Sequence, residues 1–280
     1  MERIYQKIYE QQSTFSKNLQ KISAHFYDDP KTFAIYSAAE AAKVIGVSET
    51  TVIRFCQKLN YKGYSALQKE VQHHLFQKSS LSDYVEAKAV DDKTSEPIKS
   101  LMEHDRHSIQ KVMEQIPEMH LEKTVKKLAN SDHVLIAGAR SSHALASWFA
   151  FSLDLIVGNT RFYQPNVDDV LLRISELTEQ SVFVAFSFHR YAADTIHIAK
   201  LAKQRGAFVI TFTDSPISPI TNHASLVLPL QLNVKSTLDA APAILSLTNS
   251  ITSAVSLAKP DQFQKRAKLF DSIDGQDFFA

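Results

Sequence analysis

The sequence predicts an α/β protein in two parts: an all-helical N-terminal domain followed by a three-layer α/β/α domain built on a parallel sheet. Three observations predict this fold class. Apolar residues recur at helical spacing near the N-terminus, a polar stretch follows at residues 79–100, and beyond it short apolar runs alternate with longer amphipathic ones. A chain of 280 residues is also long enough for two domains. We therefore expect domains at residues 1–78 and 101–280, joined by a linker.

The composition is typical of a folded protein from a reducing compartment. Of the 280 residues, 44% are hydrophobic and 22% are charged. The single cysteine, Cys56, excludes an internal disulfide framework and a multi-cysteine metal site. Residues 1–12 lack the apolar segment of a secretory signal, and the apolar stretch 144–158 is shorter than a membrane span and contains Asp154. We expect a cytoplasmic protein in which residues 144–158 form a buried helix.

The first domain is predicted to be helical and basic. Its apolar residues follow the 3.6-residue period of a helix, at Ile4, Ile8, Phe15, Leu19, Ile22 and Phe26. Residues 1–78 carry 11 Lys and Arg against 7 Asp and Glu, whereas the rest of the chain carries 20 against 23. This asymmetry favours a polyanion as the partner of the first domain.

Two short helices meeting at a tight turn are predicted between residues 37 and 59. Ser37 followed three residues later by Glu40 is a capping box, which marks the start of a helix. Gly46 can adopt the positive φ of a sharp turn, and Ser48 can cap a second helix. The arrangement is typical of a helix-turn-helix.

The second of these helices has one apolar and one polar face. Val52, Phe55, Cys56 and Leu59 share the apolar face. Side chains that can reach base edges or phosphates occupy the other face and its N-terminal end, and two more follow the helix: Ser48, Glu49, Thr50, Thr51, Arg54, Gln57, Lys58, Lys62 and Tyr64. We expect this set to bind duplex DNA, with a helical hairpin whose polar face is merely solvated as the alternative.

The second domain alternates predicted strands with predicted helices. The strands are expected at residues 133–137, 181–186, 207–212 and 225–230. The helices are expected at residues 101–116, 121–129, 142–156, 167–177, 192–205 and 240–257. Continuous apolar strands alternating with helices indicate a parallel sheet covered on both faces, and such sheets bind ligands at the carboxyl ends of their strands.

Two loops at strand ends carry the residues expected to bind a ligand. Residues 138–143 follow the first strand and residues 187–192 follow the second, each directly before a helix. Backbone N–H groups at helix starts, hydroxyls and guanidinium groups all favour an anion. The candidates are Arg140, Ser141, Ser142, Ser187, His189, Arg190 and Tyr191. The alternative is that these loops only connect the elements.

The remaining polar residues predict neither a metal site nor a cofactor. The 11 histidines are scattered without ligand spacing. Asp214 and Ser215, at a strand end, line the pocket or cap the following turn. The stripe of Ile244, Leu247, Ile251 and Val255 forms either a dimer interface or internal packing.

The helix-turn-helix segment resembles the DNA-binding domain of the RpiR-type transcriptional regulators. The resemblance lies in residues 38–42, 47–55, 58–59 and 63–64, which occur together and in order. In that family the domain precedes a sugar-isomerase (SIS) domain that senses a metabolite, so the resemblance implies the domain order expected above. It also implies a symmetric homo-oligomer.

The ligand loops depart from the loops of SIS domains, which bind phosphosugars through Gly-x-Gly-x-Ser and Ser-x-Ser-Gly-x-Thr motifs. Arg140 replaces the second glycine of the first motif, although Ser142 keeps its serine. In the second motif His189, Arg190 and Ala192 replace serine, glycine and threonine. The resemblance therefore implies the fold, whereas the ligand is a phosphosugar, a sugar acid or another carboxylate. Alternatively, the larger side chains fill the pocket and the domain only dimerises.

These residues are compatible with three functions. The leading hypothesis is a DNA-binding transcriptional regulator, without enzymatic activity, whose SIS-like domain senses a small anionic metabolite and modulates operator binding. Its partners are an operator duplex, the anionic effector and further copies of the chain, as a dimer or tetramer. The alternative is a phosphosugar isomerase or lyase on the same scaffold, and a third is a protein-interaction module that makes no use of the polar face around Arg54.

Overall fold

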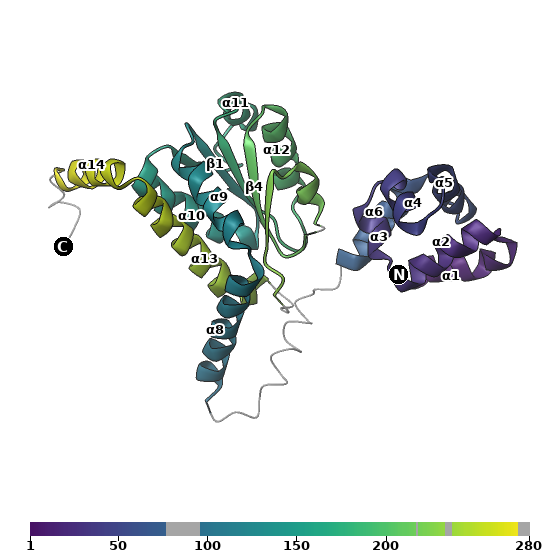
Figure 1. The fold of residues 1–280 in the computed structure, drawn as a ribbon. Helices are drawn as coiled ribbons and strands as arrows, with labels where there is room; N and C mark the ends of the chain where they lie inside the picture. The colour runs from purple at the N-terminus through teal and green to yellow at the C-terminus, as the bar shows by residue number, and fades with distance from the viewer. Residues whose placement is uncertain (77–95, 217, 233–236, 274–280) are drawn as a thin grey trace. The chain divides into compact units, whose positions relative to one another are not determined.

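The computed structural model describes residues 1–76, 96–216, 218–232 and 237–273, and it contains two compact units (Figure 1). The units span Met1–Ser80 and Leu81–Ala280. Most of the predicted linker, residues 79–95, lies outside the described residues. Its last part is helical, because the first helix of the second unit begins at Pro97 and not at residue 101.

The first unit is a bundle of short helices. These are α1 (Glu2–Gln11), α2 (Lys17–Asp28), α3 (Lys31–Ile35), α4 (Ala38–Ile45), α5 (Glu49–Lys58) and α6 (Tyr64–Phe76), with a 3₁₀ turn at Gln12–Thr14. The stripe predicted from Ile4 to Phe26 is buried in its core. Phe26, Phe33 and Phe55 fill the centre, with ring centroids 4.7 Å apart for the first pair and 6.4 Å apart for the second.

The predicted caps and turn of the helix-turn-helix are present. Ser37 accepts a hydrogen bond from the backbone N–H of Glu40, whose carboxylate accepts one from the backbone N–H of Ser37 at 2.9 Å. Gly46 has φ +72°, and a Cβ there would lie 2.8 Å from Lys21 Nζ. Ser48 accepts from the N–H of Thr51 and so begins α5. Local polar signals therefore fix both helix starts and the turn between them.

The second unit is a five-stranded parallel sheet among helices. In chain order its elements are α8 (Pro97–Gln115), α9 (Glu118–Ala129), β1 (Val134–Gly138), α10 (Ser141–Val157), β2 (Thr160–Phe162), α11 (Val170–Ser175), β3 (Val182–Phe186), α12 (Ala193–Gln204), β4 (Phe208–Thr213), a 3₁₀ turn (Pro219–His223), β5 (Leu226–Pro229), α13 (Thr237–Ala258) and α14 (Pro260–Asp271). The strand order is β2-β1-β3-β4-β5. The four predicted strands are confirmed, while β2 and α14 were not predicted.

Helices cover both faces of this sheet, which confirms the three-layer fold (Figure 1). One core lies between the sheet and helices α8, α9, α10 and α13, and includes Leu128, Phe149 and Ile244. The other lies beneath α11 and α12 and includes Ile174 and Ile198. The strands β1, β3 and β4 are therefore buried on both sides, as their continuous apolar sequences require.

The stripe on α13 packs inside the unit. Ile244, Leu247, Ile251 and Val255 are all buried against the sheet-covering helices. This supports internal packing, one of the two roles considered for the stripe. By length and composition alone, residues 238–258 of α13 could cross a membrane, but the helix packs along α8, α9 and α10 as the core helix of a folded domain does.

Candidate DNA-binding surface and ligand site

The outer face of α5 presents the predicted DNA-contacting side chains. Val52, Phe55 and Cys56 anchor the helix in the core. Glu49, Thr50, Arg54, Gln57 and Lys58 are exposed, as are Ser48 before the helix and Lys62 after it. Thr51 is half-buried, and its hydroxyl lies 2.7 Å from that of Ser48. The helix is therefore held by its inner face while the outer face is free for a partner.

Tyr64 is not on this surface. Its ring is buried, and its hydroxyl donates to the carbonyl of Tyr36 at 2.9 Å. Burial raises the pKa of this phenol well above its ordinary value. Tyr64 was predicted to contact DNA, but it instead ties the start of α6 to the end of α3 and is not available to a DNA partner.

The strand order creates a switch point between β1 and β3. From β1 the chain runs through α10 to β2 on one side, and then passes to β3 on the other side of β1. The strand ends are in register, with Gly138 beside Phe186. The two predicted ligand loops therefore emerge side by side at the carboxyl edge of the sheet, which is where parallel sheets of this kind bind ligands.

The first loop is tight and exposes an arginine. A Cβ on Gly138 would lie 2.8 Å from both Ala146 Cβ and the carbonyl oxygen of Ser142. The close approach of α10 to the end of β1 therefore requires glycine at position 138. Arg140 has φ +55° and ψ −124° and is exposed. Ser141 begins the 17-residue helix α10, and Ser142 is buried. The residue that directly precedes the positive end of the α10 dipole is thus an exposed arginine.

The second loop combines buried polar atoms with an exposed arginine. Ser187 is 2% exposed, and its Oγ has no hydrogen-bond partner among the described residues. The same holds for Nε2 of His189 within that part of the chain. Arg190 has φ +65° and is exposed. A ligand that reached Ser187 and His189 would supply partners that the described chain does not.

Asp214, at the end of β4, holds this loop in place. Its Oδ2 accepts from the backbone N–H of His189 at 3.1 Å, and its Oδ1 accepts from the hydroxyl of Tyr191 at 2.9 Å. The sequence indicated that Asp214 lines the pocket or caps a turn. The observed role is a third one, because Asp214 ties the predicted ligand loop to the neighbouring strand.

Burial sets the charge states around Asp214. Burial raises the pKa of this carboxyl, and the hydrogen bond from Tyr191 offsets part of the effect. Burial lowers the pKa of His189, and the charge of Arg190 lowers it further. Burial and the nearby carboxylate raise the pKa of Tyr191. At neutral pH His189 is therefore uncharged, so the positive charge of the loop after β3 comes from Arg190.

The two arginines are available to a ligand. Within the described part of the chain, neither Arg140 nor Arg190 forms an ion pair or a side-chain hydrogen bond. The described residues also contain no cluster of three or more His, Cys, Asp or Glu side chains that could hold a metal ion. The arrangement suits a small anion bound by guanidinium groups, hydroxyls and a helix start.

Comparison with known proteins agrees with both units. Residues 2–78 match the family model described as a helix-turn-helix domain of the rpiR family, and residues 127–258 match that of the SIS domain. This chain belongs to the RpiR-type transcriptional regulators. The regulator is 26% identical over 226 residues to an uncharacterized HTH-type transcriptional regulator of Haemophilus influenzae, a match covering 77% of this chain and 75% of the relative. It is 24% identical over 283 residues to the HTH-type transcriptional regulator HexR of Escherichia coli, with 96% of this chain and 91% of HexR covered.

A solved structure shares the fold of this RpiR-type regulator. The Vibrio vulnificus NanR protein, solved in complex with ManNAc-6P, aligns with a TM-score of 0.64 and 18% sequence identity. The alignment covers 95% of this chain and 97% of NanR. At this identity the likeness shows the fold.

Proposed function

We propose that this RpiR-type regulator binds duplex DNA through the outer face of α5 and takes a small anion between the loops that follow β1 and β3. The observation that carries the proposal is the pair of unpartnered arginines at the switch point of the sheet. Both stand in a backbone conformation that L side chains rarely adopt. Such strain persists at sites where a side chain must occupy one particular place.

For DNA, we propose that Arg54 reads a base and that Lys62 contacts a phosphate. Arg54 lies on the exposed face of α5, and arginine can bond guanine in two places. Lys62 follows the helix on the surface, where a phosphate contact positions the domain without reading sequence.

The test compares Arg54→Ala and Lys62→Ala in the intact protein, on a duplex selected from a random library and on unselected duplex. Arg54→Ala should cost about 1–3 kcal/mol on the selected duplex and relax the preference at one base pair. Lys62→Ala should weaken both duplexes alike and reduce the salt dependence. Equal losses on both duplexes for Arg54→Ala would contradict its assigned role.

For the anion, the proposed ligand class is a phosphosugar, a sugar acid or another small carboxylate. NanR binds ManNAc-6P through the same fold, which supports the first class. Arg140 and Arg190 support a ligand richer in negative charge than a plain hexose phosphate, because each adds a guanidinium that can bind a carboxylate or phosphate in bidentate fashion. We expect ordinary hexose phosphates to bind weakly.

A thermal-shift panel of sugar phosphates, sugar acids and amino-acid-derived carboxylates identifies the class. Arg190→Ala should abolish the shift given by the best anion, and Arg190→Lys should restore part of it, since lysine keeps the charge but not the planar fork. Substitution of Ser141 by Ala is the milder control. If a neutral compound alone stabilises the protein and Arg190→Ala leaves that shift unchanged, the anion site is refuted.

We propose that the protein senses its ligand without converting it. A sugar-phosphate isomerase needs a positioned base, and His189 is the only uncharged imidazole in the loop. That single feature favours the alternative function, and proton exchange tests it directly. NMR of the best ligand with catalytic amounts of protein in D₂O should show no exchange of its carbon-bound protons, and exchange that His189→Ala abolishes would establish an enzyme.

Two further features belong to the proposal. A regulator that reads paired half-sites acts as a symmetric homo-oligomer, so we propose a dimer or a dimer of dimers. We also propose the cytoplasm as its location, because its proposed partner is the operator DNA.

A further inference from the structure

The loop that follows β3 contains two buried polar atoms, Ser187 Oγ and His189 Nε2. Neither has a hydrogen-bond partner among the described residues. The side chain of Ser187 is 2% exposed, and the ring of His189 is half-buried. Folded proteins keep few such atoms, because a buried donor or acceptor without a partner costs free energy. The two atoms therefore indicate where a ligand would complete the loop.

Asp214 fixes the backbone of this loop but leaves Nε2 of the imidazole free. Its Oδ2 accepts from the backbone N–H of His189 at 3.1 Å, and its Oδ1 accepts from the hydroxyl of Tyr191 at 2.9 Å. The rings of His189 and Tyr191 meet edge to face, with their centroids 6.3 Å apart. The loop is thus held in place while Nε2 can still bond to something else.

Three titratable or charged groups face the imidazole, and together with burial they leave it neutral. Burial and the charge of Arg190 lower the pKa of His189, and the carboxylate of Asp214 offsets only part of this effect. The phenol of Tyr191 stays neutral, because burial and the same carboxylate raise its pKa. A new negative charge beside the ring would therefore shift a balance in which opposing effects already act on His189.

We propose that His189 takes up a proton when an anion binds in this loop, so that affinity for the anion rises as the pH falls. The inference rests on the anion site proposed above. An anion at Nε2 offsets the charge of Arg190 and accepts a hydrogen bond from the imidazolium, so it stabilises the charged ring. The proton comes from the solvent and adds to the ring nitrogen that lacks one.

The sign and the pH range of the effect follow from linkage. In the free protein the pKa of His189 lies below its ordinary value, and in the complex it is higher. Above both values the ring is neutral in both states, and below both it is charged in both, so affinity is constant. Between them, binding takes up a proton and affinity rises as the pH falls. Each unit by which binding raises the pKa adds a factor of about ten.

Sulfate is the probe, because it keeps its charge over the whole range and any pH dependence belongs to the protein. The full chain is titrated with sulfate between about pH 8 and about pH 5.5, where histidine changes charge. NMR of the imidazole C–H signals follows the ring, and the signal missing from His189→Gln identifies His189. Sulfate should raise the titration midpoint of His189 by about one unit, and affinity should rise about tenfold on acidification.

His189→Gln is the matched variant, since glutamine keeps an N–H donor but cannot gain a charge. It should bind sulfate with an affinity that does not change over this range. The comparison also separates His189 from Asp214, whose pKa burial raises. Protonation of that carboxylate would likewise favour an anion at low pH. A pH dependence that persists in His189→Gln therefore belongs to another group and overturns the proposal.

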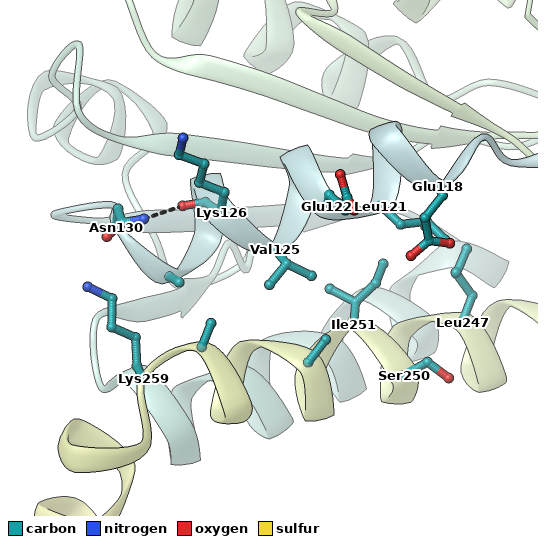
Figure 2. A pocket seen from close by; sticks show the side chains of 13 residues that line it. Glu118, Leu121, Glu122, Val125, Lys126, Asn130, Leu247, Ser250, Ile251 and Lys259 are labelled. Atoms are coloured by element: carbon teal, nitrogen blue, oxygen red, sulfur yellow. Dashed lines mark hydrogen bonds between the residues drawn. The ribbon is translucent and has the colours of Figure 1, made fainter.

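A second pair of cations could bind sulfate elsewhere and provides the control. Lys126 and Lys259 lie at the same end of a groove of about 600 Å³ between α9 and α13 (Figure 2). The floor of this groove is apolar and includes Val125 and Ile251. Lys259→Gln should leave both the affinity for sulfate and its pH dependence unchanged. Binding that Lys259→Gln abolishes would place the anion in the groove and overturn the proposal.

Arg190→Gln separates failure of this inference from failure of the anion site itself. It should weaken sulfate binding at every pH, because it removes the guanidinium of the loop. If sulfate does not bind, or if Arg190→Gln leaves its binding unchanged, the anion site is refuted and the inference with it. If sulfate binds through Arg190 without moving the titration of His189, the anion site stands and proton uptake is refuted.

Discussion

Arg140 and Arg190 show how single residues diverge from a family pattern at positions whose backbone conformation favours glycine. Each stands where the loops of similar SIS domains carry glycine, and each has a positive φ, +55° and +65°. Both positions thus have the positive φ that glycine adopts readily, but in this chain each carries an arginine side chain. A non-glycine residue in such a conformation costs on the order of 1–3 kcal/mol. That cost is consistent with a functional role for both side chains.

Arg140→Gly should therefore increase the free energy of unfolding of the second unit by about 1 kcal/mol, because glycine adopts this conformation without strain. The same variant should weaken binding of the best anion from the thermal-shift panel. Arg140→Ala is the matched control, since it removes the guanidinium but keeps most of the strain. Urea denaturation measures stability, and a loss of stability in the glycine variant would show that Arg140 supports the loop.

Cys56 illustrates a reactive group silenced by its position. It lies on the buried face of α5 with no exposed surface, and burial raises the pKa of its thiol to about 12. Since the thiolate is the nucleophile, the folded protein should not react with a disulfide reagent at neutral pH. It should react with one equivalent after denaturation, because the chain has a single cysteine. Rapid reaction in the folded state would instead indicate local opening of α5.

Among the elements, those with local signals were predicted and those that depend on distant contacts were not. Residues adjacent in the sequence indicate the caps at Ser37 and Ser48 and the long apolar strands. The strand β2 has only three residues, too few for a pattern, and α14 has no buried face that would mark it. Hydrophobic pattern showed that α10 is apolar all round, but it could not show which side the chain itself covers.

The candidate site divides in the same way. Both ligand loops could be located from the sequence, because each directly follows an apolar strand. The hydrogen bond between Asp214 and the backbone N–H of His189 joins residues 25 positions apart that follow two different strands, and no local sequence pattern contains it. Tyr64 was expected at the surface because tyrosine commonly contacts phosphate. Its hydroxyl instead reaches a carbonyl 28 residues earlier, a contact that only the folded bundle creates.

The junction of β1 and α10 requires a glycine at position 138, and this requirement can be tested. A Cβ at position 138 would lie 2.8 Å from Ala146 Cβ and from a backbone carbonyl of α10, and neither can move without shifting the helix. Gly138→Ala should therefore destabilise the second unit by about 1–3 kcal/mol and weaken anion binding, because the start of α10 moves. Gly63→Ala is the control, since a Cβ there meets nothing within 4 Å. Its effect on stability, read by urea denaturation, should be about 0.5 kcal/mol or less.

At the scale of the whole molecule, the two parts of the chain differ in net charge in a way that suits their two proposed functions. The first unit carries the excess of Lys and Arg suited to DNA, and the remainder carries a slight excess of Asp and Glu. Each unit has its own buried core. A ligand in the second unit can change DNA affinity only if it binds the DNA-bound and free forms with different affinities. The proposed dimer could transmit the effect of the ligand to the DNA-binding surface, because a change in the dimer's geometry would change the spacing of its two α5 helices.

The effect of the anion on DNA affinity and the effect of DNA on anion affinity must be equal in size. If the best anion changes affinity for the selected duplex by the typical 1–3 kcal/mol, a factor of about 5–150, the duplex must change affinity for the anion by the same factor. Titration calorimetry of the anion with and without saturating duplex measures one side of the cycle, and DNA titrations with and without anion measure the other. A factor near one in both titrations would show that the anion does not modulate DNA binding, contrary to the proposed function.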